Sequence, residues 1–201
     1  MRWLSLCAVL GALLLPASAA PCRPDTTTTA TTTASTTTAT SEPTASILNG
    51  DFEGADLSVW QERTVTIVEN AQKAHSGTHY ARYIYSDEYA WGGNNLNQTI
   101  TDLDVTRLYR LSFSGAVFGL TNLNGETCQM EALLRGNVKK SWPITNFVSG
   151  AYSSYSTDLT VDDEDLTLTL RLRCTTQHKV SIEFGVDDIS LKDIGAAPSA
   201  T

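Results

Sequence analysis

The stretch that decides the fold is Leu166-Thr167-Leu168-Thr169-Leu170-Arg171-Leu172-Arg173-Cys174. Apolar and polar side chains alternate along it without a break. This pattern is typical of a β-strand with one buried face and one solvated face. The stretch therefore predicts a half-buried strand whose leucines point inward and whose threonines and arginines point outward.

The same two-residue period recurs along the chain, and no window of 12 residues carries a helical apolar stripe with caps. Asn-Gly, Ser-Gly and Gly-Gly pairs separate the runs and predict turns. The last run changes its apolar parity, which a β-bulge near Gly185–Asp188 would explain. The other runs with this period are 65–67, 96–100, 109–117, 128–134 and 180–191. Together they predict an all-β fold, an antiparallel β-sandwich.

The first 20 residues have the features of a secretory signal peptide. Arg2 supplies the positive charge, residues 3–15 form a short apolar core, and Ala17-Ser18-Ala19 matches a cleavage site. The apolar core is too short to span a bilayer. The small, polar stretch Gly195–Thr201 argues against a lipid anchor. We therefore expect a secreted, soluble protein of the extracellular space or cell wall.

The segment 21–46 is almost entirely Thr, Ser and Ala from Thr26 onward, with Pro43 near the end. It includes no large apolar side chain whose burial could offset the entropy of ordering the chain. This composition predicts a disordered, O-glycosylated stalk, and the alternative is an unmodified flexible linker. The expected folded domain is 47–195, followed by a disordered tail at 196–201.

The chain has a formal net charge of −8. An acidic surface without a basic patch argues against nucleic acid and anionic membranes as partners. Neutral partners such as sugars fit this charge, although solubility alone also explains it.

Three cysteines remain after the signal peptide is removed. Cys128 and Cys174 both lie in strand-like runs, and an exported protein favours a disulfide, so we expect these two to pair. Cys22 is then left over, either as a free thiol or in an intermolecular bond.

The sequence has no motif that requires catalysis. No nucleophile elbow, phosphate loop or zinc-protease signature is present. His75 and His79 are separated by a predicted turn, and the acidic run 162–165 is expected to be a solvated turn rather than a catalytic pair. We therefore expect a protein that is not an enzyme.

Five aromatic residues fall between Tyr80 and Trp91. Trp91 precedes two glycines, where full burial is difficult, so we expect Trp91 to contact a ligand. Sugar rings stack on aromatic planes, and their hydroxyls bond to amides such as that of Asn94. Tyr89 is a further candidate, whereas Tyr80, Tyr83 and Tyr85 are expected to pack in the core. The sequon Asn97-Gln98-Thr99 predicts N-glycosylation at Asn97.

Four segments together resemble the cenC-type carbohydrate-binding modules, the group of families 4, 9 and 22. They are Ile47-Leu48-Asn49-Gly50-Asp51-Phe52-Glu53, His75-Ser76-Gly77-Thr78-His79-Tyr80-Ala81, Trp91-Gly92 and Val186-Asp187-Asp188-Ile189-Ser190-Leu191. The stalk and the expected disulfide are similar to those of secreted fungal members. The resemblance implies a galactose-binding-like jelly roll.

The resemblance also implies site residues. Glu53 and Asp187 match positions of a structural calcium in the family, and carboxylates are ligands that calcium prefers. Trp91 matches an aromatic residue of the family's sugar-binding groove. Gln129 and Glu131 lie on the expected non-core face of their strand. The family's arginine shortly before the tryptophan is absent, since 86–90 reads Ser-Asp-Glu-Tyr-Ala.

We therefore expect a non-catalytic, secreted, monomeric carbohydrate-binding module that recognises a polysaccharide or glycan by aromatic stacking and polar contacts. Tyr155, in a polar strand, is a further candidate for the groove. One alternative is a structural or adhesive cell-wall protein without sugar specificity, in which Cys22 cross-links the chain. A small glycan-active enzyme is the other; it would need two carboxylates facing one cleft.

Overall fold

The computed structural model describes residues 47–121, 123, 125–175 and 178–198. The expected signal peptide, the stalk and Cys22 lie outside the described residues. No helix within them is long and apolar enough to cross a membrane. Their single helical element is a 3₁₀ turn at Ile144–Asn146, so the fold consists of strands and connecting loops.

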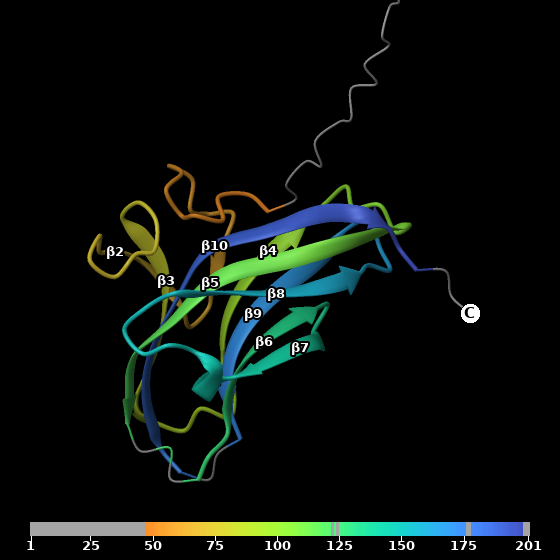
Figure 1. Ribbon diagram of the computed structural model, residues 1–201. Helices are drawn as coiled ribbons and strands as arrows, with labels where there is room; N and C mark the ends of the chain where they lie inside the picture. The colour runs from red at the N-terminus through yellow and green to blue at the C-terminus, as the bar shows by residue number, and fades with distance from the viewer. Residues whose placement is uncertain (1–46, 122, 124, 176–177, 199–201) are drawn as a thin grey trace, which may run out of the picture. The chain divides into compact units, whose positions relative to one another are not determined.

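The strands form two antiparallel five-stranded sheets packed face to face, and they appear as two layers in Figure 1. Sheet A has the order β1 (Gln61–Glu62), β4 (Asn94–Ile100), β9 (Leu166–Cys174), β6 (Cys128–Leu134) and β7 (Asn137–Pro143). Sheet B has the order β2 (Thr66–Glu69), β3 (His79–Glu88), β10 (Val180–Ala196), β5 (Arg107–Thr121) and β8 (Ser153–Thr160). The predicted antiparallel jelly-roll β-sandwich is confirmed.

Strand β9 lies at the centre of sheet A, and its four leucines are buried in the core between the sheets. Two tyrosines of β3, in the opposite sheet, reach its backbone. The hydroxyl of Tyr83 donates to the carbonyl oxygen of Leu170 at 3.1 Å, and that of Tyr85 donates to Leu172 at 3.0 Å. These bonds satisfy two buried hydroxyls and join the sheets across the core. Tyr83 and Tyr85 are thus core residues, as expected.

The predicted irregularity in the last strand is present. The pairing of β10 with β5 changes register between Asp187 and Ser190, and Asp188 adopts a positive φ of 49°. Phe184 and Val186 are buried before the bulge, and Ile189 and Leu191 after it. The bulge lets apolar side chains of both parities face the same core.

The expected disulfide joins Cys128 to Cys174. The two cysteines lie directly opposite each other, at the start of β6 and the end of β9. The pairing of β6 with β9 continues from them without a shift up to Leu134 and Leu168. The disulfide therefore lies at one end of an unbroken ladder that fixes which outward side chains of these strands are neighbours.

We expect Leu170→Ala to lower the free energy of unfolding by about 2–5 kcal/mol, because Leu170 is fully buried and its truncation leaves a cavity. Chemical denaturation measures this loss. Thr169→Ala is the matched control, since Thr169 is its neighbour on the outward face. A similar loss in both variants would contradict the assignment of the two faces.

Candidate functional site

The outward residues of β4, β9 and β6 form a polar surface, which we call the sheet A face. They lie in register across the three strands, because each strand alternates between core and outward positions. One row contains Asn95, Arg171 and Glu131, and a second contains Asn97, Thr169 and Leu133. A third pairs Arg173 with Gln129. This face therefore collects two of the predicted ligand residues, Gln129 and Glu131.

Glu131 is the centre of this face. Its side chain is only 1% exposed although it points away from the core. Arg171 donates from Nε to Oε2 of Glu131 at 2.6 Å, and its Nη2 lies 2.6 Å from the same oxygen in an ion pair. Gln129 donates to Oε1 at 2.7 Å. Nη2 of Arg173 lies 3.4 Å from the same Oε1. The buried carboxylate is thus bonded and neutralised, as a charge at low exposure must be.

Trp91 lies at one end of the sheet A face, in the loop between β3 and β4, and is 71% exposed. The loop is joined to the end of β9, because the amide of Cys174 donates to the carbonyl of Ala90 at 3.1 Å. Gly93 has a φ of 74°, and a Cβ there would lie 2.7 Å from Cδ of Arg171. The stem of Arg171 therefore passes over Gly93, which places the tryptophan loop beside the Glu131 cluster.

Three of the other predicted ligand residues differ in their surroundings. Tyr89 is exposed in the same loop as Trp91. Asn94 is buried, and its amide donates to the carbonyl of Ile84 at 2.9 Å, so it fastens the loop to β3 instead of facing a ligand. Tyr155 belongs to β8 of sheet B, where it packs on Phe147 and donates to Asn146. The structure therefore does not bring Asn94 and Tyr155 to the sheet A face.

Asn97, the predicted glycosylation site, points outward from the same face. It pairs with Thr169, and Arg171 is the diagonal neighbour on β9. Diagonal neighbours on one face are about 7–8 Å apart. Oδ1 of Asn97 is buried and has no hydrogen-bond partner in the described part of the chain. Any group attached to Asn97 would therefore lie close to the Glu131 cluster.

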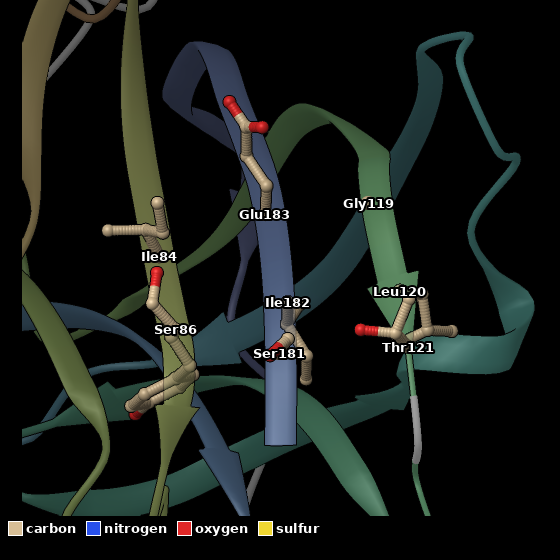
Figure 2. Close-up of a pocket in the computed structure, with 9 residues that line it drawn as sticks. Ile84, Ser86, Gly119, Leu120, Thr121, Ser181, Ile182 and Glu183 are labelled. Carbon is tan, nitrogen blue, oxygen red and sulfur yellow. The ribbon is translucent and has the colours of Figure 1, made fainter.

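Sheet B carries a separate hollow of about 180 Å³ on β3, β10 and β5, shown in Figure 2. Ile84 and Leu120 are its exposed apolar side chains, and Gly119 is part of its lining. Glu183 at its edge is already bonded to Lys73 and Arg82. The volume is smaller than the roughly 300 Å³ at which ligand pockets begin. This hollow is thus a weaker candidate than the sheet A face.

The carboxylates of the two expected calcium ligands both bind one turn, residues 75–79, through its backbone N–H groups. Oε1 of Glu53 accepts from Thr78 and His79, each at 2.6 Å. Oδ2 of Asp187 accepts from His75 at 2.8 Å and from Ser76 at 3.1 Å. Burial raises the pKa of Asp187 to about 6.

This arrangement does not fit the expected calcium site. The turn offers N–H hydrogens to the carboxylates, whereas calcium needs additional oxygen ligands. Within the described ranges, no group of three or more His, Cys, Asp or Glu side chains is placed to hold a metal ion. Glu53 and Asp187 instead attach the turn to the rest of the fold. Calcium binding by Glu53 and Asp187 stays a prediction.

Sequence reasoning missed Arg171 and Arg173 as site residues, although it placed both on the outward face. The signal was present in the expected disulfide. Antiparallel pairing that starts at Cys128 and Cys174 brings Gln129 opposite Arg173 and Glu131 opposite Arg171. Two opposite charges on facing positions then indicate an ion pair on the sheet surface.

Neither the known protein-family profiles nor the curated protein sequences include a match to this chain. Solved structures do match. A family 22 xylan-binding module of Paenibacillus barcinonensis Xyn10C has a TM-score of 0.54 at 13% identity, covering 78% of this chain and 98% of its own. A family 61 carbohydrate-binding module solved with β-1,4-galactotriose has a TM-score of 0.53 at 14% identity, covering 75% and 99%.

A third match contains a family 22 module together with a catalytic module. It is Clostridium thermocellum xylanase 10B solved with xylohexaose, with a TM-score of 0.51 at 14% identity, covering 76% of this chain and 28% of its own. At these identities the matches establish the fold, a β-sandwich shared with carbohydrate-binding modules.

We expect Glu53→Gln to lower the free energy of unfolding in a pH-dependent way. The backbone N–H groups of Thr78 and His79 lower the pKa of Glu53 to about 2. Because this is below the ordinary value of 4.5, the stabilisation is complete above pH 4.5 and is lost as the pH falls toward 2. Urea unfolding of both proteins between pH 2 and 6 should show the difference shrinking over that range.

Glu69→Gln, on the exposed end of edge strand β2, is the control and should have little effect throughout. A Glu53→Gln difference that does not depend on pH would contradict the role of the charge. If calcium raises the unfolding midpoint of the wild type and not of Glu53→Gln, Glu53 is a calcium ligand after all.

Proposed function

We propose that this chain is a non-catalytic carbohydrate-binding module that binds a polysaccharide or glycan on the sheet A face. The observation that carries the proposal is the exposure of Trp91 beside the Glu131 cluster. Trp91 and Tyr89 are both exposed in one loop, and adjoining exposed apolar side chains mark interaction sites more often than a single one does. Here the Trp91 ring lies next to fixed polar groups, which is the combination that sugar rings require.

In this proposal a sugar ring stacks its C–H face on the indole of Trp91, and Tyr89 extends the aromatic surface. The amide of Gln129 and the guanidinium groups of Arg171 and Arg173 bond to sugar hydroxyls. The ion pair with Glu131 holds Arg171 in place before a ligand arrives, so little side-chain entropy is lost on binding.

The matched modules support a sugar ligand, since one was solved in complex with β-1,4-galactotriose and another is a xylan-binding domain. The polar groups also favour binding over catalysis. A glycosidase needs two carboxyl groups beside one bond, with one of them available as an acid. Glu131 is buried against Arg171 and bonded to Gln129, which suits a structural carboxylate.

We further propose that the module is exported, carried on a glycosylated stalk formed by 21–46, and N-glycosylated at Asn97. The signal-like start and the disulfide between Cys128 and Cys174 support export. Because Asn97 and Arg171 share one face, a glycan on Asn97 would compete with a polysaccharide for the same surface.

Trp91→Ala should weaken retention on an insoluble polysaccharide that binds the wild type by about tenfold or more, because one central aromatic contact dominates such sites. The variant should fold normally, since the side chain is 71% exposed. Pull-down of residues 47–198 against plant, fungal and bacterial polysaccharides gives the measurement.

Leu120→Ala is the matched control, because it removes an exposed apolar side chain from the hollow of sheet B. A loss in Leu120→Ala with none in Trp91→Ala would move the binding site to the hollow. Failure of the wild type to bind any polysaccharide would contradict the proposed function.

Removal of the Asn97 glycan should increase polysaccharide retention. Protein secreted from a glycosylating yeast would be compared before and after endoglycosidase treatment, with mass measurement to establish occupancy. Thr99→Ala, which removes the sequon, should behave like the trimmed protein. Equal retention by occupied and trimmed protein would show that the glycan does not cover the sheet A face.

A further inference from the structure

In the Glu131 cluster of the sheet A face, positive charges outnumber negative charges by one. Glu131 supplies a single negative charge, and Arg171 and Arg173 supply two positive charges. Arg171 alone accounts for the pairing, because two of its nitrogens lie 2.6 Å from one carboxylate oxygen. Gln129 bonds to the other oxygen. The charge of Arg173 is therefore left largely uncompensated.

The hydrogen-bond donors of Arg173 are also largely unused. Its contact with Glu131 is 3.4 Å long, beyond the usual range of an N–H···O bond. Its Nε is buried and has no hydrogen-bond partner among the described residues. Buried N–H groups without partners are uncommon and costly. At the same time the side chain is 36% exposed, so part of the guanidinium is open to a ligand.

Two other acidic residues of the described chain pair with other partners. Asp87 lies at the end of β3 in sheet B and pairs with Lys179. Glu126 precedes the disulfide and pairs with His178. The open part of the Arg173 guanidinium lies on the outward face of β9. Cys174, the next residue along the chain, is bonded to the loop that carries Trp91.

We infer that the sheet A face selects an acidic glycan, one that presents a uronic-acid carboxylate to Arg173 while a neighbouring ring stacks on Trp91. This inference rests on the proposed function and adds its ligand class. A carboxylate is planar and matches the fork of a guanidinium with two parallel hydrogen bonds. One carboxylate also balances the single excess charge.

The rest of the protein does not attract an acidic glycan, so the preference must come from contacts at Arg173. The chain as a whole carries −8, so a polyanion gains nothing from general attraction to it. At physiological salt, charges more than about 8 Å apart are largely screened. The affinity for an acidic glycan therefore depends on its direct contact with Arg173. Acidic glycans should therefore bind only where they can reach Arg173.

The test compares two pairs of polysaccharides that differ only in charge. They are glucuronoxylan and its carboxyl-reduced form, and polygalacturonate and its carboxyl-reduced form. Affinity electrophoresis at physiological salt with residues 47–198 gives the dissociation constants. We expect the wild type to bind at least one uronate form about tenfold more tightly than its reduced partner.

The variants separate charge from shape. Arg173→Gln should abolish the preference for the uronate form, because it should weaken binding of the uronate form much more than binding of the reduced form. Arg173→Lys keeps the charge without the fork and should retain only part of the preference. Arg110→Gln is the matched control, because Arg110 is an exposed arginine of sheet B paired with Asp158. It should behave like the wild type. Circular dichroism confirms that each variant is folded.

The outcomes distinguish this inference from the proposed function. Equal binding of charged and reduced forms, or equal losses on both forms in Arg173→Gln, would overturn the acidic selection. If Trp91→Ala still abolished binding in that case, the proposed function would stand. Tighter binding of a sulfated polysaccharide than of every uronate form would overturn the assignment of a carboxylate. If no polysaccharide were bound, both would fail.

Discussion

The strict alternation of β9 is the constraint on which the other features depend. One parity places four leucines in the core of the sandwich, and the other places two threonines and two arginines on the sheet A face. Because the period of a strand is two, the core residues and the site residues cannot move independently. A shift of β9 by one residue would bury Arg171 and expose Leu170. The tyrosine hydroxyls of β3 oppose such a shift, since they bond to the carbonyls of Leu170 and Leu172.

The same strand links stability to the candidate site. Cys174 closes the disulfide and also donates its amide to Ala90, at the base of the tryptophan loop. Gly93 then lets the chain pass beneath the stem of Arg171 on its way into β4. The loop that exposes Trp91 is therefore fixed at both ends by backbone contacts to β9. An exposed aromatic ring on a fixed loop loses little freedom when a ligand stacks on it.

Local patterns predicted the elements, and long-range pairing determined the site. The alternation of β9 and the outward parity of Glu131 were readable from the sequence, as was the disulfide. Asn94 was misjudged because its position after two glycines gives no sign that its amide reaches Ile84. Tyr155 was misjudged because a polar strand looks the same in either sheet. Glu53 and Asp187 were expected to bind calcium, but their carboxylates accept hydrogen bonds from backbone N–H groups of the turn 75–79. Such backbone directions do not follow from residue types.

A buried charge pair is a weak source of stability, because the cost of removing both ions from water offsets most of their attraction. The Glu131 cluster is thus better understood through what it positions. Arg171 and Gln129 are fixed by their bonds to the carboxylate. Arg173 lies 3.4 Å from it, and its Nε has no hydrogen-bond partner among the described residues. If the cluster served stability alone, a second arginine 3.4 Å away would add a desolvation cost that its weak attraction to Glu131 would not offset. Its presence beside the Trp91 loop is explained when a ligand completes the arrangement, since the ligand then supplies the acceptor that no described residue provides.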